Sequence, residues 1–357
     1  MEILERVMKA AKHEEPDKVP VALQCYSMVL KRYHRMLEKD YYKDVRVQLE
    51  SYIAIQRRFP EVYFTILWPE TVPLTIFVPV AFGGKWIEME DSSPWAESPI
   101  KTPEDVDRLV SAGIPDIEEV PYVRQFLDGL RYFYDWYPRD LRDKYGYIDG
   151  DIVSPPLVEG AALTVGYDKF LVWMRLYPDV VHKLLKLVTE FLIKLFKAEE
   201  EIVGKAKKLF LPDHTPSMLN REQFNEFCLP YFNKIFDRYS GALRIWHNEG
   251  KCSKILDDVD KIHADVWHFG DDPAICKKKT HFCLMGNLEP AGVMLKGTPE
   301  EVEEQAKEVI YEAGEGGGLW LSTAGGLAPG TPFKNIEALI RACDKYGRYP
   351  LKRVVNK

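Results

Sequence analysis

The chain has few of the features that mark secreted and nucleic-acid-binding proteins. It holds six cysteines in 357 residues, and none of them forms a C-x-x-C pair. Scattered cysteines are typical of reduced intracellular thiols rather than of a disulfide framework. The formal net charge is −7, whereas a nucleic-acid surface needs clustered lysine and arginine. We therefore expect neither disulfides nor nucleic-acid binding.

Long apolar runs are also lacking. The most apolar stretches, residues 62–69 and 71–84, are broken by Glu70, Pro73 and Pro79. Neither reaches the roughly 18 apolar residues that a membrane span requires. Residues 1–18 are charged throughout and have no apolar signal-peptide segment. The sequence thus predicts a cytoplasmic protein that does not enter a membrane.

What the chain does contain is an alternation of short β-like runs with amphipathic helical stretches. Eight such runs separated by helices predict an α/β protein, a parallel (β/α)8 TIM barrel. A doubly wound sheet is the main alternative, but no G-x-G-x-x-G follows the first run. The predicted strands are Val19–Leu23, Tyr63–Pro69, Gly146–Ile152, Lys208–Pro212, Leu243–Trp246, Ala264–His268, His281–Gly286 and Gly318–Ser322.

Two segments are additional to a minimal barrel. Residues 28–60 form an added helical segment after the first strand, and residues 76–98, which contain Gly83-Gly84, form a hairpin after the second. Both are expected near the barrel mouth. No interdomain linker is evident, so residues 1–357 are predicted to form a single domain.

The predicted strand ends carry polar side chains, and barrel enzymes place their chemistry at the C-terminal ends of the strands. His247 and Glu249 stand two positions apart after an apolar run, so they point to the same side of an extended strand. Imidazole and carboxylate together suit zinc or a harder divalent ion. Asp213, His214 and His268 are the candidates for a third ligand. The alternative for an isolated H-x-E is a solvated strand end.

Aromatic and acidic residues near the same strand ends are candidates for binding the substrate. Large aromatic side chains are more often core residues, but those that face the mouth would suit a flat aromatic ligand or a corrin ring. The candidate substrate-binding residues are Tyr26, Trp68, Glu70, Asp151 and Trp246.

Three blocks resemble the uroporphyrinogen decarboxylase superfamily: HNEGKCSKILDDVDKIHADVW, CLMGNLEPAGVMLKGTPEEVEEQAKEVI and GGGLWLSTAGGLAPGTPFKNIEALIRA. The resemblance extends over most of the chain and implies a (β/α)8 barrel. True decarboxylases of this superfamily carry an R-Q-A-G-R segment after the first strand. Here that place reads LQCYSM, without arginine. The resemblance therefore favours the other branch, the corrinoid-dependent methyltransferases.

The resemblance also implies a zinc site, with a difference in its ligands. Methyltransferases that act on coenzyme M hold zinc through H-x-C-G after the fifth strand and a cysteine after the eighth. This chain keeps His247 and Gly250, but has Glu249 in place of the first cysteine and Gly325 or a neighbour in place of the second. A carboxylate makes the site harder and the metal a better Lewis acid.

The altered ligand set leads to a hypothesis about function. We expect methyl transfer from a methyl ether or methoxylated aromatic to cobalt(I) of a corrinoid carried by a partner protein. The departing oxygen would be stabilised by zinc or by a proton from Asp213, His214 or His268. The alternatives are a thiol methyltransferase, a decarboxylase of the same superfamily, and a non-catalytic relative that binds a tetrapyrrole. The sequence does not decide between a monomer and a homodimer.

Overall fold

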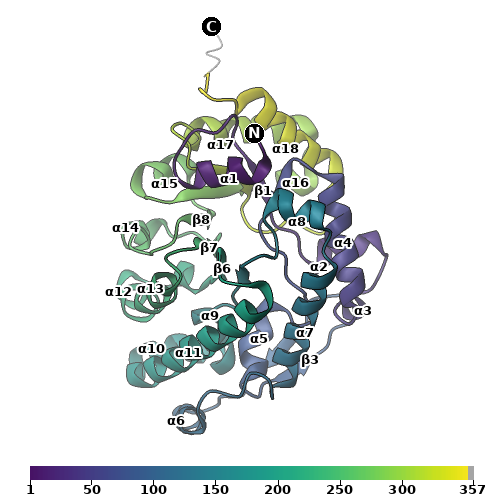
Figure 1. Cartoon of the computed structure of the whole chain (residues 1–357). Helices are drawn as coiled ribbons and strands as arrows, with labels where there is room; N and C mark the ends of the chain where they lie inside the picture. Colours follow the sequence, from purple (N-terminus) through teal and green to yellow (C-terminus); the bar gives the residue numbers. More distant parts are fainter. Residues whose placement is uncertain (353–357) are drawn as a thin grey trace.

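Eight parallel strands form the centre of the molecule, inside a ring of helices (Figure 1). The computed structural model describes residues 1–352, apart from the side chain of Tyr33. The strands are hydrogen-bonded in the order β2-β1-β10-β9-β8-β7-β6-β5. This curled parallel sheet confirms the predicted barrel-like fold. The strands are β1 Val21–Leu23, β2 Val62–Phe64, β5 Asp151–Val153, β6 Lys208–Pro212, β7 Leu243–Asn248, β8 Val266–Phe269, β9 Cys283–Leu288 and β10 Leu319–Thr323.

Side chains connect the two end strands of the sheet, β2 and β5. The Phe64 amide donates a hydrogen bond of 2.7 Å to the Tyr147 hydroxyl. Lys208 at the start of β6 donates to the Thr65 carbonyl at 3.1 Å and pairs with Asp151 at 2.8 Å. The curled sheet is thus completed by side-chain contacts between its end strands.

The helices follow the amphipathic patterns of the sequence. Helix α11 buries its apolar face, and α17 starts after a capping box formed by Thr298 and Glu301. No helix of the described residues is long and apolar enough to cross a membrane. The helices are α1 Ile3–Ala11, α2 Ser27–Leu30, η1 Lys31–Tyr33, α3 Glu38–Tyr41, α4 Val45–Arg58, α5 Leu74–Ala81, α6 Pro103–Ala112, α7 Pro121–Trp136, α8 Arg139–Tyr145, α9 Val158–Val165, α10 Tyr167–Leu176, α11 Pro178–Val203, η2 Thr215–Met218, α12 Arg221–Phe227, α13 Leu229–Arg238, η3 Ser253–Ile255, α14 Leu256–Val259, α15 Pro273–Lys279, α16 Val293–Lys296, α17 Pro299–Ala313 and α18 Phe333–Tyr346.

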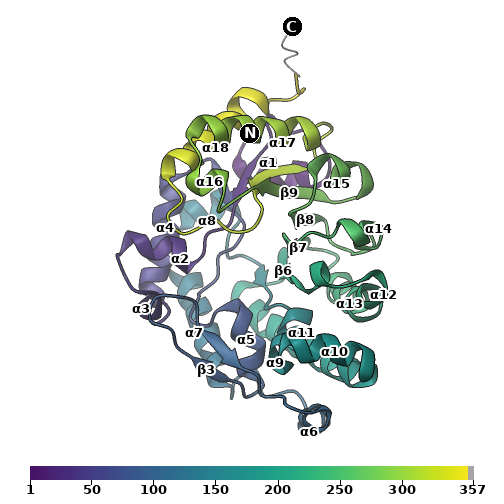
Figure 2. The same ribbon diagram turned by 180° about the vertical axis from the view of Figure 1, so that it is seen from behind.

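Both added segments are present. The first consists of α2, η1, α3 and α4. The second contains the predicted hairpin, but only from β3 (Lys85–Ile87) to β4 (Trp95–Glu97), which pair antiparallel. Its first predicted residues belong to helix α5, which is buried and packs against α9. Residues 76–81 of α5 are all buried, so the run has no polar positions at helical spacing. For this reason the sequence pattern predicts a strand here. Figure 2 shows the hairpin beside α5 and apart from the central strands.

The third predicted strand starts five residues too early. Helix α8 ends at Tyr145, and residues 146–150 form a turn in which Gly146 and Gly150 have φ of 66° and 72°. Only at Asp151 does β5 begin. Asp151 therefore stands at the N-terminal end of its strand, where it pairs with Lys208. The prediction that Asp151 faces the barrel mouth is wrong, because its position relative to the turn was misjudged.

Candidate functional site

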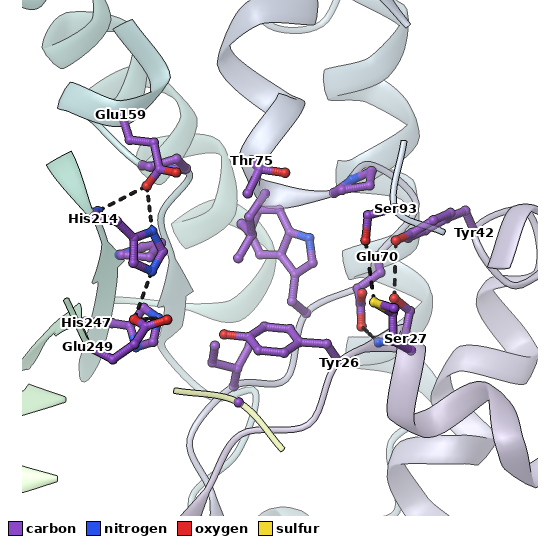
Figure 3. A pocket seen from close by; sticks show the side chains of 18 of the residues that line it. Tyr26, Ser27, Tyr42, Glu70, Thr75, Ser93, Glu159, His214, His247 and Glu249 are labelled. Atoms are coloured by element: carbon purple, nitrogen blue, oxygen red, sulfur yellow. Dashed lines mark hydrogen bonds and ion pairs between the residues drawn. The ribbon is translucent and has the colours of Figure 1, made fainter. Parts of the chain in front are cut away.

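Three side chains that could hold a metal converge at the C-terminal ends of β6 and β7. His214 follows β6, His247 lies in β7, and Glu249 follows β7 directly. Oε2 of Glu249 lies 2.9 Å from Nε2 of His214 and 3.0 Å from Nε2 of His247. Their potential ligand atoms all lie within 4.8 Å of one another. Figure 3 shows the three side chains turned toward one another on one wall of a pocket.

A fourth residue, Glu159 of α9, supports His214 from the other side. Its Oε2 lies 2.7 Å from Nδ1 of His214 and accepts a hydrogen bond from the His214 amide. Burial disfavours the charged imidazole, but hydrogen bonds to Glu159 and Glu249 outweigh it and raise the pKa of His214 to about 11. Burial likewise opposes ionisation of Glu249, yet His247 and His214 hold its pKa well below the usual range. Without a metal, His214 thus carries a proton between two carboxylates.

His268 lies behind His247 and does not line the pocket. Its Nδ1 is 2.8 Å from Nδ1 of His247, and its Nε2 is 2.7 Å from the Thr323 carbonyl oxygen. The same Nε2 also accepts a hydrogen bond from the Gly325 amide at 3.0 Å, so the ring is held from both sides. Burial and the neighbouring His247 lower the pKa of His268 to about 3. His268 therefore contacts His247 from behind the pocket, and its expected role as proton donor to the substrate stays a prediction.

Asp213 also has a structural position. It is fully buried, and its Oδ2 accepts hydrogen bonds from the amides of Val158 and Glu159 at the start of α9. Its Oδ1 accepts from the Thr215 amide. Burial and the charge of Glu159 raise the pKa of Asp213 to about 7. Asp213 thus fixes the start of α9, and with it Glu159, while its expected role as proton donor stays a prediction.

The donor set fits a catalytic metal ion. Two imidazole nitrogens and one carboxylate oxygen are a ligand set of catalytic zinc, which keeps a further position open. The distal nitrogens of His214 and His247 contact Glu159 and His268, as the outer partners of metal-bound histidines do. His214, rather than Asp213 or His268, is the third candidate ligand.

A glycine occupies the place from which a further ligand could reach this cluster. A Cβ at Gly325, in the loop after β10, would lie 3.1 Å from Oε1 of Glu249, and its φ is +94°. The position is therefore close enough to supply a side chain, but it has none. The resemblance implies a cysteine ligand near this position. In this chain Gly325 stands there, so that ligand is absent.

The support of His247 by His268 gives a testable prediction. We expect His268→Ala to weaken zinc binding by about 10- to 100-fold, the usual cost of removing an outer partner of a ligand. Competition with a chromogenic chelator measures this affinity, and the melting temperature checks that the variant folds. His281→Ala removes a histidine that is hydrogen-bonded to Asp260 at the surface and serves as control. Equal zinc affinity in both variants would contradict the supporting role.

A pocket of about 280 Å³ opens in front of the three side chains. Figure 3 shows Tyr26 and Thr75 in the middle, with Glu159, His214, His247 and Glu249 on one side and Ser27, Tyr42, Glu70 and Ser93 on the other. No lysine or arginine among the described residues lines it. The lining residues are Tyr26, Ser27, Met28, Tyr42, Tyr52, Ile66, Trp68, Glu70, Pro73, Leu74, Thr75, Ser93, Pro156, Glu159, Pro212, His214, His247, Glu249 and Gly326.

Three of the predicted substrate-binding residues, Tyr26, Trp68 and Glu70, line this pocket. Trp246 does not. It is fully buried and stacks on Trp267 with ring centroids 5.5 Å apart. Successive residues of a strand alternate in direction, so Trp246 points away from the face of His247. The structure therefore places Trp246 outside the pocket, whereas the sequence predicts it among the substrate-binding residues.

Several pocket residues were missed in the sequence. Glu159 follows β5, the strand that the sequence predicts at residues 146–152. A carboxylate after a barrel strand is a recognisable candidate for a site residue. Ser27, Tyr42 and Ser93 come from the two added segments. Nothing in their local sequence indicates that these segments fold over the barrel mouth.

Comparison with known proteins identifies the family. A family model described as uroporphyrinogen decarboxylase (URO-D) matches residues 3–346. A methylated-thiol–coenzyme M methyltransferase of Methanosarcina mazei is 26% identical over 211 residues, covering 57% of this chain and 55% of that relative. The uroporphyrinogen decarboxylase of Schizosaccharomyces pombe is 23% identical over 368 residues, covering 96% and 97%.

A solved structure agrees with the fold. A methyltransferase from Methanosarcina mazei superposes with a TM-score of 0.78 at 21% identity, covering 97% of this chain and 99% of that one. This likeness shows that the two chains share their fold over nearly their whole lengths. Because the family model matches nearly the whole length, this chain belongs to the uroporphyrinogen decarboxylase family.

Proposed function

We propose that this protein is a methyltransferase that moves a methyl group from a small aryl methyl ether to cobalt(I) of a corrinoid on a partner protein. The observation that carries the proposal is a small pocket that no lysine or arginine of the described residues lines and that ends at His214, His247 and Glu249. Such a pocket suits a substrate without negative charge, whose reacting oxygen is placed at the cluster.

Decarboxylation of a porphyrinogen fits this pocket poorly. The carboxylates of that substrate need cationic partners when they are buried, and neither lysine nor arginine of the described chain lines the cavity. A cavity of about 280 Å³ is at the small end of ligand sites, which span roughly 300–1,000 Å³. The same size argues against enclosure of a tetrapyrrole by a non-catalytic relative. A corrin ring would therefore remain with its partner protein at the mouth.

The proposed transfer is a displacement at the methyl carbon. The electron pair of cobalt(I) forms the cobalt–carbon bond, the carbon–oxygen bond breaks, and its electron pair stays on the oxygen. A phenol has a pKa near 10, so an aryl ether can leave as phenolate, which needs charge stabilisation more than a proton. When bound at His214, His247 and Glu249, zinc would supply positive charge at that end of the pocket.

The protein's own residues have two tasks in this reaction. Trp68 and Tyr26 line the pocket and would pack against the aromatic ring of the substrate. Glu159 and His268 fix the orientations of His214 and His247 through their distal nitrogens. Orientation of this kind lowers the barrier because the groups need not reorganise during the reaction.

Methylation of a thiol is the second candidate, and the name of the Methanosarcina mazei relative favours it. Against it stands the carboxylate of Glu249, together with Gly325, where thiolate ligands are implied by the resemblance. A carboxylate leaves more positive charge on the metal and is better suited to an oxygen leaving group.

An anaerobic assay with free cob(I)alamin separates these candidates. The zinc-loaded protein is mixed with cob(I)alamin and methoxybenzene, and methylcobalamin is followed by its absorbance. We expect methylcobalamin and phenol in equal amounts, and none with protein stripped of metal by a chelator. No product from any aryl ether, combined with methylation of a thiol by methylcobalamin, would replace the proposal by the second candidate.

A further inference from the structure

The end of the pocket opposite His214, His247 and Glu249 is a second polar site. Glu70, Ser27 and Tyr42 lie there together, away from the histidines (Figure 3). We call these three residues the acceptor end. The proposed reaction uses the other end and the middle of the pocket, so these groups have no part in the chemistry described above.

The hydroxyl protons of the acceptor end are already used. The Ser27 hydroxyl donates to Oε1 of Glu38 at 2.5 Å, and the Tyr42 hydroxyl donates to the same atom at 2.8 Å. Glu38 is fully buried, and its Oε2 pairs with Lys31 at 3.2 Å. Because both hydroxyl groups donate their hydrogen bonds to Glu38, the oxygens of Ser27 and Tyr42 can only accept a hydrogen bond from a ligand.

Glu70 is the third acceptor. Its Oε1 accepts hydrogen bonds from the Ser27 amide at 2.8 Å and the Tyr52 hydroxyl at 3.3 Å. Glu70 is 7% exposed, and within the described residues the pocket wall has no lysine or arginine to pair with its carboxyl. Burial raises the pKa of Glu70 to about 8, as expected for a carboxyl without a cation.

We propose that the acceptor end binds a hydrogen-bond donor, a hydroxyl or an ammonium group, on the methyl-donating substrate, and that Glu70 makes the deciding contact. This inference rests on the proposed function, because it names the polar part of the same substrate. A hydroxyl suits the neutral or the ionised carboxyl, whereas an ammonium group pairs with the ionised form. A negatively charged group would find no lysine or arginine among the described pocket residues and is therefore expected to bind most weakly.

Binding of four substituted methoxybenzenes tests the inference. Isothermal titration calorimetry is run with 3-methoxyphenol, 3-methoxybenzylammonium, 1,3-dimethoxybenzene and 3-methoxybenzoate. We expect the phenol, the ammonium compound or both to bind at least about tenfold more tightly than the dimethoxy compound, the gain from one buried hydrogen bond. The benzoate should bind most weakly. The order of the first two identifies whether a hydroxyl or an ammonium group is preferred.

Variants connect this selectivity to one side chain. Glu70→Gln keeps the shape but turns a donor amide toward the pocket, so the tenfold preference should disappear and the benzoate should gain affinity. Glu88→Gln, on the hairpin and paired with Lys43 at the surface, should behave as the native protein. Melting temperatures confirm that both variants fold. The inference would be overturned if 1,3-dimethoxybenzene bound as tightly as the phenol and the ammonium compound. It would also be overturned if Glu70→Gln kept the native preference for these two compounds.

The outcome is separate from that of the proposed function, because binding needs neither corrinoid nor methyl transfer. Selective binding without formation of methylcobalamin would refute the proposed reaction and support the acceptor end. Methylcobalamin formation with equal affinity for all four compounds would support the reaction and refute the acceptor end.

Discussion

Replacing His214 by alanine is expected to remove the bound metal and to stop methyl transfer. His214 supplies one of three donor atoms, and the remaining pair, His247 and Glu249, leaves too few protein ligands for a stable zinc site. The loss of affinity should exceed the roughly 10- to 100-fold that removal of an outer partner costs. Elemental analysis of protein purified without affinity metal should fall from about one zinc per chain to a trace.

A matched control separates this effect from a general effect of losing a histidine. His263 lies at the surface, 2.6 Å from Asp237, and likewise pairs a histidine with a carboxylate. His263→Ala should keep the zinc and the activity. His214→Ala also removes the imidazole that pairs with both Glu159 and Glu249, so a modest fall in melting temperature is expected. Full zinc content in His214→Ala would show that a different residue completes the site.

Replacing Trp246 by alanine is expected to lower the free energy of unfolding by about 3–5 kcal/mol, the usual cost of truncating a buried tryptophan. The ring is fully buried, stacks on Trp267 and lies 6.2 Å from the ring of Phe232 on α13. Urea unfolding measures the change. Because Trp246 does not reach the pocket, the KM of the folded fraction should stay unchanged.

The comparison for Trp246 is an exposed tryptophan. Trp95 on the hairpin is 50% exposed, and Trp95→Ala should change stability by no more than about 0.5 kcal/mol. A Trp246→Ala variant of near-native stability with a raised KM would restore the substrate-binding role that the sequence first suggested.

The pair His247 and Glu249 was predictable because the period of a strand is two residues. This local rule holds wherever the strand lies, and it places both side chains on one face. The same rule could have excluded Trp246, which stands between the inward positions. Parallel pairing in register then puts His247 beside His268 and Trp246 beside Trp267. Side chains that face inward on β7 therefore lie beside inward-facing side chains on β8, and outward-facing ones beside outward-facing ones.

The choice among Asp213, His214 and His268 could not be made from the sequence. All three follow or end strands next to β7, so spacing treats them alike. What separates them is helix α9, which binds Asp213 through its first amides and presents Glu159 to His214. A contact between residues 55 positions apart depends on how α9 packs, and no local pattern encodes it.

The sequence by itself determined the barrel-like alternation of strands and helices and the position of His247 and Glu249, because both follow from periodicities of 3.6 and two residues. Only the tertiary structure decided that His214 completes the cluster and that Glu70, Ser27 and Tyr42 form the opposite end of the pocket. The physical reason is that these side chains meet through the packing of α9 and of the two added segments over the mouth, which is set by long-range contacts rather than by local spacing.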